Sequence, residues 1–428
     1  MSAAVRHDKG RGDLQSHPEV RPTADRTRAV LAAAAFLVLA CALSYRAVAL
    51  RAVDGSASWV LGDFRNAVYY PVVAWLDGHN PYDVAHQLAA YPATTKFPLY
   101  SPLTLLIHLP FGLLPVHAAE VLYYAVALVL VPVLALVVLE ACGVARTPAR
   151  VFGLAALILA SRPGHQNLLL GQVTLQVTIG SYLALRYAHD RPSVAGLGLA
   201  VSTLKPTFGA PLAFLMLCRG AWRATTIGMA LGGLLASAVA LSLVHAAGSV
   251  ASLVDSVRGS WDVSMVSSSA HPALSVSRID AVALVARLLG RSPGTAVTLG
   301  IAVGLLGVGG LGIRRLARQG NAEGDLGIAL ICLSVLTCTY HQSYDLLLLT
   351  LPLAMLAVGT PSLDVSPPMR WTLCTLLGLP AANYLATEGV VARLGLTGGW
   401  WNAVTSLNGA AMLAAFALCT RAALRANR

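Results

Sequence analysis

Apolar stretches alternate with short polar ones along most of the chain, which predicts a protein built from membrane helices. The first long stretch, AVLAAAAFLVLACALSYRAVAL at residues 29–50, rises about 1.5 Å per residue as a helix and can cross roughly 30 Å of hydrocarbon. Placing the remaining apolar stretches between the polar ones predicts about twelve spans, at residues 29–50, 117–140, 150–163, 167–186, 192–204, 206–218, 224–246, 293–312, 326–340, 342–358, 370–387 and 401–421. Several are shorter than the ~17 residues of a straight span, so we expect some helices to end at mid-depth between their neighbours.

The polar segment at residues 51–116 predicts more than a plain loop. FRNAVYYPVVAWL and YDVAHQLAAY have the apolar and aromatic spacing of short interfacial helices. The continuation YPATTKFPLYSPLTLLIHLPFGLLP cannot form one continuous span, because its prolines break the helix, but it can form a re-entrant hairpin. No internal repeat of clear period is present, which disfavours an inverted-repeat transporter fold.

Composition supports an all-α polytopic membrane protein. Of the 428 residues, 56% are hydrophobic and only 11% are charged, so most of the chain must lie in lipid. Residues 29–421 are predicted to form a single transmembrane domain. Residues 1–28 are polar and of mixed charge, which predicts a disordered cytoplasmic tail, and residues 422–428 form a second short tail. The first apolar stretch is too extended for a cleaved signal peptide, so we interpret it as a retained anchor.

The formal net charge of +11 reflects topology rather than nucleic-acid binding, because the basic residues cluster between apolar stretches. These clusters contain Arg146, Arg150, Arg186, Arg191, Arg219, Arg223, Arg314, Arg315, Arg318, Arg421, Arg425 and Arg428. By the positive-inside rule they and both termini face the cytoplasm of a cell-membrane protein. The segments left on the extracytoplasmic face are residues 51–116, 162–167, 247–292 and 388–400, with the turn near residue 341.

The sequence contains no clear motif for a metal or another cofactor. The seven cysteines form no C-x-x-C pair, which indicates neither a disulfide framework nor a zinc site. No D-x-D pair suited to a metal lies near Asp63, and no glycine-rich nucleotide loop follows a strand. We therefore expect neither a metal nor another cofactor.

Lys205, in VSTLKPTFGAP, lies beside Pro206 between two apolar stretches that are each too short to span. Ionisable groups at membrane depth are costly, so each is a functional candidate. The Lys205 ammonium could snorkel to an interface or pair with an acid, and it could instead bind an anion such as phosphate.

Two polar turns on the predicted extracytoplasmic face hold further candidates. RPGHQNLLLGQVTLQ contains Arg162 and Asn167, which ordinary turn chemistry could explain, and Gln172, whose amide needs a partner inside an apolar helix. TYHQSYDLLLLTLP contains His341 and Tyr344 where two apolar stretches meet. In the same motif Asp345 could be a helix cap or an ion-pair partner of Lys205.

Asp63, in LGDFRNAVYY, has three interpretations. It could be the N-cap of a helix that begins near Arg65, where aspartate is favoured. It could pair with Arg65, worth about 1 kcal/mol or less at an exposed site. It could also be a general base, which needs a partly desolvated pocket and a nucleophile within hydrogen-bond reach.

Three long motifs together resemble the family 87 polytopic glycosyltransferases of bacterial envelope assembly. They are GDFRNAVYYPVVAWLDGHNPYD, FPLYSPLTLLIHLPFGLLP and GQVTLQVTIGSYLALRYAHDRPSVAGLGLAVSTLKPTFGAPL, and the similarity covers roughly residues 55–360. The resemblance implies a glycosyltransferase-C-type fold with about ten to thirteen transmembrane helices. It also implies an inverting transfer on the extracytoplasmic face, from a polyprenyl-phosphate sugar, typically mannose, to a lipid-linked envelope glycan such as a phosphatidylinositol mannoside or lipomannan.

The resemblance also assigns roles to single residues. It implies that Asp63 is the general base, and that Lys205 and His341 attend the donor phosphate and sugar. The remaining positions assigned to substrate binding are Arg65, Tyr69, Asn80, Tyr82, Arg162, Asn167, Gln172 and Tyr344. Many relatives carry paired histidines in the late motif, whereas this chain has Tyr340, His341 and Gln342.

The main alternative is a flippase or a transporter of a small polar solute, which would distribute polar residues through both leaflets. The candidates here gather on one predicted face, which favours an enzyme. An intramembrane hydrolase is a second alternative, but the sequence contains no G-x-S-x-G or H-E-x-x-H motif. The predicted partners are therefore the sugar donor, the glycan or glycolipid acceptor and the lipid bilayer, without nucleic acid.

Overall fold

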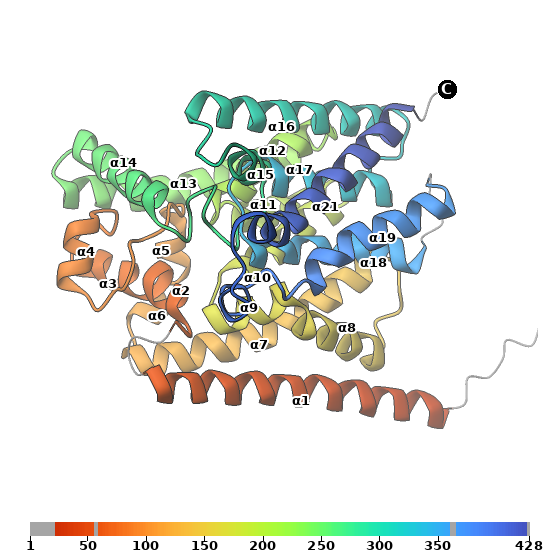
Figure 1. Ribbon diagram of the computed structural model, residues 1–428, viewed down its shortest axis with the longest axis horizontal. Helices are drawn as coiled ribbons and strands as arrows, with labels where there is room; N and C mark the ends of the chain where they lie inside the picture. The colour runs from red at the N-terminus through yellow and green to blue at the C-terminus, as the bar shows by residue number, and fades with distance from the viewer. Residues whose placement is uncertain (1–21, 55–58, 360–364, 426–428) are drawn as a thin grey trace, which may run out of the picture.

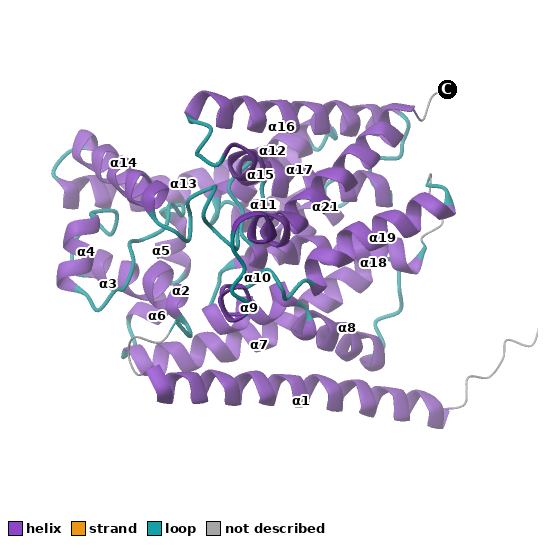
Figure 2. Cartoon of the chain, viewed as in Figure 1, coloured by secondary structure: helices purple, strands orange, loops and turns teal. Residues whose placement is uncertain are grey.

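A computed structural model describes residues 22–54, 59–359 and 365–425, and these residues form helices joined by loops (Figures 1 and 2). No β-strand occurs within these three ranges, where the one extended pairing is an isolated bridge between Arg278 and Gln342. The all-α prediction is confirmed. Of the tail predicted for residues 1–28, residues 1–21 lie outside the described residues. Residues 22–28 are helical rather than disordered, because α1 (Pro22–Asp54) begins at Pro22.

Five helices are long and apolar enough to cross a membrane. They are α1, α7 (Val116–Ala141), α13 (Trp222–Ala247), α16 (Thr295–Arg318) and α21 (Gly398–Arg425). Shorter apolar helices are α8 (Pro148–Ala160), α11 (Pro192–Ser202), α12 (Pro206–Cys218), α17 (Asp325–Cys338) and the pair η3 (Ser343–Leu349) and α18 (Thr350–Val358). The protein is therefore a multi-pass membrane protein. Several of the predicted spans were expected to be short, and α8, α11 and α12 are such helices, each with a proline in its first turn.

The short helices pack into the centre of the bundle through small residues. All fourteen residues of α17 are buried. A Cβ at Gly180 of α10 (Thr174–Arg186) would lie 2.6 Å from the Gly198 carbonyl oxygen of α11, and one at Gly196 would lie 2.6 Å from Ile227 of α13. Helices in lipid associate mainly by such close packing, so these glycines fix the stacking of α10, α11 and α13.

The remaining helices are mostly short and connect the longer ones. They are α2 (Gly62–Phe64), η2 (Arg65–Tyr69), α3 (Tyr70–Leu76), α4 (Val84–Ala90), α5 (Leu103–Ile107), α6 (Leu109–Gly112), α9 (Arg162–Leu170), α14 (Val250–Val266), α15 (Ala281–Leu289), α19 (Pro367–Ala382) and α20 (Glu388–Arg393). The small helices α2 to α6 and α14 gather at one end, opposite the start of α1 and the end of α21 (Figure 1). The short helices predicted within residues 51–116 are thus present.

Candidate active site

Asp63 lies in a distorted stretch between α1 and α3. The preceding Leu61 has φ 55°, and it is the one non-glycine residue with positive φ in the described parts of the chain. The π-helical turn η2 follows immediately. Left-handed leucine and π-helical turns are unfavourable locally and concentrate at functional sites. Here the Leu61 N–H donates to the Leu169 carbonyl oxygen of α9 at 2.7 Å, which holds the distortion in place.

Gly171 brings the end of α9 against α2. Its φ of 72° ends the helix in the left-handed conformation that favours glycine. A Cβ at this position would lie 2.6 Å from the Cβ of Phe64, closer than any two such atoms can pack. The absence of a side chain therefore allows the next residue, Gln172, to reach Asp63.

We expect Gly171→Ala to lower both stability and activity more than Gly143→Ala does. Gly143 also has positive φ, at 66°, but an added Cβ there would meet nothing within 4 Å. Both variants lose about 1–2 kcal/mol from the left-handed backbone, and Gly171→Ala loses about a further 1–3 kcal/mol from the clash with Phe64. Thermal unfolding in detergent and transfer rates measure the difference. Equal effects of the two variants would contradict a special role for the contact with Phe64.

The Asp63 carboxylate is half-buried and only partly bound. Gln172 Nε2 donates a short hydrogen bond to Oδ2. Within the described ranges, Oδ1 accepts no hydrogen bond from the protein. Burial raises the pKa of Asp63 above its usual value, although the bond from Gln172 and the nearby Lys205 ammonium oppose that shift. A raised pKa makes the carboxylate a stronger base.

The two structural interpretations of Asp63 do not fit these contacts. The N-cap of α2 is Leu61 and that of η2 is Phe64, so the N-cap interpretation is wrong. Arg65 donates to the Val60 carbonyl oxygen at 2.8 Å, and its Nε lies 3.6 Å from Glu120 of α7. The ion pair made by Arg65 therefore joins α7 rather than Asp63.

Gln172 links Asp63 to Lys205. Its Oε1 accepts from Lys205 Nζ at 3.2 Å and from the Tyr100 hydroxyl at 3.2 Å. Because the same amide donates to Asp63, its two ends are oriented by opposite partners. Lys205 Nζ also donates to Thr174 at 2.7 Å and to Asp345 at 2.9 Å.

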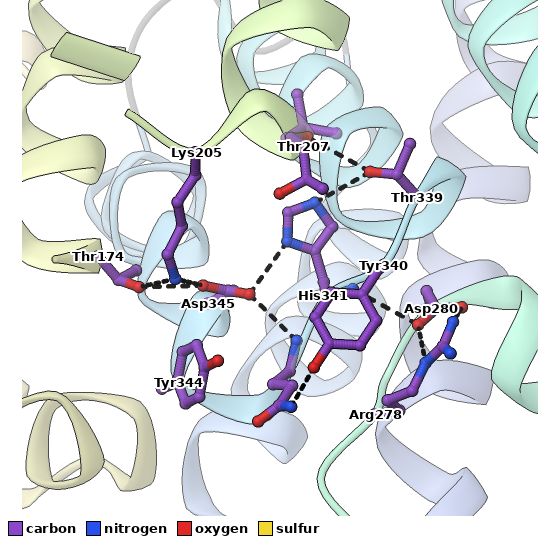
Figure 3. A network of polar contacts seen from close by, with 12 residues as sticks. Thr174, Lys205, Thr207, Arg278, Asp280, Thr339, Tyr340, His341, Tyr344 and Asp345 are labelled. Carbon is purple, nitrogen blue, oxygen red and sulfur yellow. Dashed lines mark hydrogen bonds and ion pairs between the residues drawn. The ribbon is translucent and has the colours of Figure 1, made fainter. Parts of the chain in front are cut away.

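Asp345 connects Lys205 to His341 (Figure 3). One carboxylate oxygen accepts from Lys205, and the other accepts from the Gln342 N–H and lies 3.1 Å from His341 Nδ1. Asp345 is the ion-pair partner of Lys205, which confirms one of the two predictions made for it. The N-cap of η3 is Gln342, and Asp345 contributes to the capping box from the third helical position. His341 is fully buried, and its ring lies between Asp345 and Thr339. Its Nε2 lies 3.4 Å from the Thr339 hydroxyl.

Aromatic rings surround the Lys205 ammonium. Nζ lies 4.6 Å from the ring centroid of Tyr344, 5.6 Å from that of Tyr100 and 5.9 Å from that of Phe208. Such cation–π contacts hold a cation in a place that excludes water. The site thus combines a partly free carboxylate with a fixed positive charge, both held by Gln172.

Of the predicted site residues, the structure brings together Asp63, Gln172, Lys205, His341 and Tyr344. Asn167 supports this group, because its amide donates to the Tyr344 carbonyl oxygen at 3.0 Å. The others have structural partners: Tyr69 donates to Leu114 O, Asn80 Oδ1 accepts from Tyr82 N–H, Tyr82 donates to Tyr100 O, and Arg162 donates to Asn383 O and Ala386 O.

Tyr100 and Thr174 belong to the network but were not predicted. Tyr100 follows a proline-rich stretch, and Thr174 begins a helix, so neither residue type stands out at its position. Within the described ranges, no group of three or more His, Cys, Asp or Glu side chains is placed to hold a metal ion.

Comparison with known proteins gives one match. The sequence model of Glycosyltransferase family 87 matches residues 99–340, which is more than half of the chain. No curated protein and no solved structure matches. The matched range contains Tyr100, Gln172, Thr174 and Lys205, and it ends just before His341 and Asp345.

Proposed function

The chain belongs to glycosyltransferase family 87, and on that premise we propose that it transfers a sugar from a polyprenyl-phosphate donor to a hydroxyl of a lipid-linked envelope glycan. The proposed sugar is mannose. The proposed general base is Asp63. The observation that carries this proposal is a half-buried carboxylate with one oxygen bound by Gln172 and the other without a hydrogen bond from the described residues.

The proposed reaction is a single inverting displacement. The acceptor hydroxyl oxygen attacks the anomeric carbon while the bond from that carbon to the phosphate oxygen breaks. The hydroxyl proton passes to Asp63, and the polyprenyl phosphate leaves with the electron pair. The leaving phosphate needs no proton from the enzyme, so one base and one stabilising cation suffice.

Lys205 is the proposed cation for the leaving phosphate. Its ammonium is fixed by Thr174 and Asp345 and makes its longest hydrogen bond, at 3.2 Å, to Gln172. In this proposal a phosphate oxygen replaces the Gln172 contact, and Tyr344 and Tyr100 line the approach. His341 acts through Asp345, which it orients. Fixed positive charge where negative charge develops lowers the barrier without reorganisation.

We place the reaction on the extracytoplasmic face of the cell membrane. The arginine clusters lie at the helix ends opposite to Asp63. One hollow at those ends is lined by Arg186 and Arg219, together with Glu140 and Glu323. Basic residues at helix ends favour the cytoplasmic side. A lipid-linked donor would enter from the bilayer, where the short helices α2 to α6 replace full spans.

A transporter or flippase fits this arrangement less well. A transport path needs polar side chains through both leaflets. The buried helix α17 fills the centre of the bundle. It begins with Asp325 and carries no charged side chain after that residue. The polar network around Asp63 lies on one side of that packed centre.

The proposed function is tested with membranes that contain the protein and labelled polyprenyl-phosphate mannose. We expect label to appear in a glycolipid or glycan product, and membranes with Asp63→Asn to make far less of it. Accumulation of intact labelled donor on the other side of sealed vesicles, without a new glycosidic bond, would instead identify a carrier.

The pH dependence of transfer tests the role of Asp63 separately. Only the carboxylate can accept the proton, so activity is lost as pH falls through the pKa of Asp63. Because burial raises that pKa, we expect the acid limb above the value of about 3.9 for an ordinary aspartate. A rate profile of the purified enzyme measures the limb. A limb at or below the ordinary value would contradict a buried aspartate base.

A further inference from the structure

A groove runs between α16 and α21 on the outer surface of the bundle. Its volume is about 610 Å³, and its walls include Leu305 and Val308 of α16 with Leu413, Phe416 and Ala417 of α21. The two helices pack against each other and converge at the end of the molecule where α21 ends (Figure 1). The groove is therefore apolar along most of its length and reaches one membrane surface.

Five arginines lie at that end of the groove. Arg421 and Arg425 line the groove itself, one helical turn apart. A second hollow of about 400 Å³ shares Leu424 with it and is lined by Arg314, Arg315 and Arg318 of α16. Arginines of α16 and α21 thus gather at the same end of the groove.

These arginines lack acidic partners among the described residues, unlike other arginines at the same end. Arg146 pairs with Glu140 at 2.9 Å, Arg219 with Glu323 at 3.1 Å, and Arg186 with Asp190 at 3.4 Å. No such pair involves any of the five within the described ranges. The charge of this arginine cluster is therefore available to an external anion.

Two buried polar atoms beside the groove also lack partners. Thr420 Oγ1 lines the groove, and Arg315 Nε lies at its arginine end. In the described structure neither atom makes a hydrogen bond. A buried unpaired polar atom costs about 1–3 kcal/mol, so a ligand that supplies an acceptor there is favoured.

We propose that this groove binds an anionic phospholipid of the bilayer, with an acyl chain along α16 and α21 and the phosphodiester at the arginine cluster. A phosphodiester offers paired oxygens that suit the planar guanidinium, and hydrocarbon suits the apolar walls. Basic pockets between helices at a membrane surface are typical of such sites. The groove lies at the opposite end of the bundle from α2 and the Asp63 site, so this lipid is neither donor nor acceptor (Figure 1).

The test measures lipid binding by the full chain in detergent, and its outcome does not depend on sugar transfer. Phosphatidylglycerol and phosphatidylcholine of equal chain length are added separately, and binding is followed by native mass spectrometry and by thermal unfolding. We expect phosphatidylglycerol to bind more tightly and to raise the unfolding temperature more. Equal binding of the two lipids would overturn the proposal.

Charge and groove are then tested by separate variants. Arg421→Gln with Arg425→Gln should weaken phosphatidylglycerol binding about 30-fold, since each arginine near an anionic lipid contributes about a factor of five. Arg223→Gln, which removes an exposed arginine outside the groove, should leave binding unchanged. Ala417→Trp, which fills the groove but keeps the charge, should also weaken binding.

Inorganic phosphate separates a lipid from a free anion. If phosphate alone at millimolar concentration raises the unfolding temperature as much as phosphatidylglycerol does, the cluster is an anion site and the lipid proposal is wrong. Unchanged binding in both the paired arginine variant and Ala417→Trp would equally exclude it.

Discussion

Asp63→Asn is expected to lower the rate of sugar transfer by about 10²- to 10⁴-fold, because it removes the proposed base. The change keeps the size of the side chain and an oxygen that can accept from Gln172, so the protein should still fold. Because an amide cannot take the acceptor's proton, the loss should fall on the rate of the chemical step and leave donor affinity near that of the unchanged protein. Single-turnover rates and donor binding measure the two effects separately.

Asp262→Asn is the matched control for this prediction. Asp262 is an exposed acid on α14, at the same end of the molecule as α2 (Figure 1). The substitution removes one negative charge from that end of the molecule and changes no residue of the hydrogen-bond network around Asp63. Transfer should therefore continue at the unchanged rate. Substantial turnover by Asp63→Asn, or an equal loss in both variants, would contradict the role of Asp63 as base.

The sequence predicted the polar centre of the site better than its surroundings. Gln172 and Lys205 are costly in apolar segments, so each was a functional candidate from the sequence alone. Asp63 and His341 were assigned roles by the family resemblance. Their contacts depend on a packing that sequence does not show: Gly171 sets the approach of α9 to α2, and no pattern predicts its contact with Phe64.

Arg162 has partners that the sequence does not indicate. It lies in a polar turn that ordinary turn chemistry could explain, and its role in substrate binding stays a prediction. In the structure its guanidinium donates to the carbonyl oxygens of Asn383 and Ala386, more than two hundred residues later in the chain. Backbone carbonyls at a helix end are acceptors in any sequence, so such a partner leaves no signal. For a related reason composition does not count the crossings, since an apolar stretch has the same composition whether it crosses or stops.

Lys205→Met is expected to destabilise the protein by about 3–5 kcal/mol, because it leaves the Asp345 carboxylate buried without its ammonium partner. The side chains of both residues are almost fully buried, at 5% and 4% exposed. Thermal unfolding in detergent measures this cost. An activity loss in this variant alone is ambiguous, since a damaged fold and a missing phosphate contact both give it.

The double variant Lys205→Met with Asp345→Asn separates these two causes. It removes both charges of the buried Lys205–Asp345 ion pair together, so neither is left without the other, and much of the lost stability should return. If Lys205 also stabilises the leaving phosphate, the double variant should still bind the donor weakly and transfer the sugar slowly even though its stability has returned. Recovery of donor affinity and rate along with stability would show that Lys205 only holds Asp345 and Gln172 in place. The structure favours the first outcome, because two acceptors fix the ammonium while its longest bond is to Gln172, the residue that also binds the proposed base.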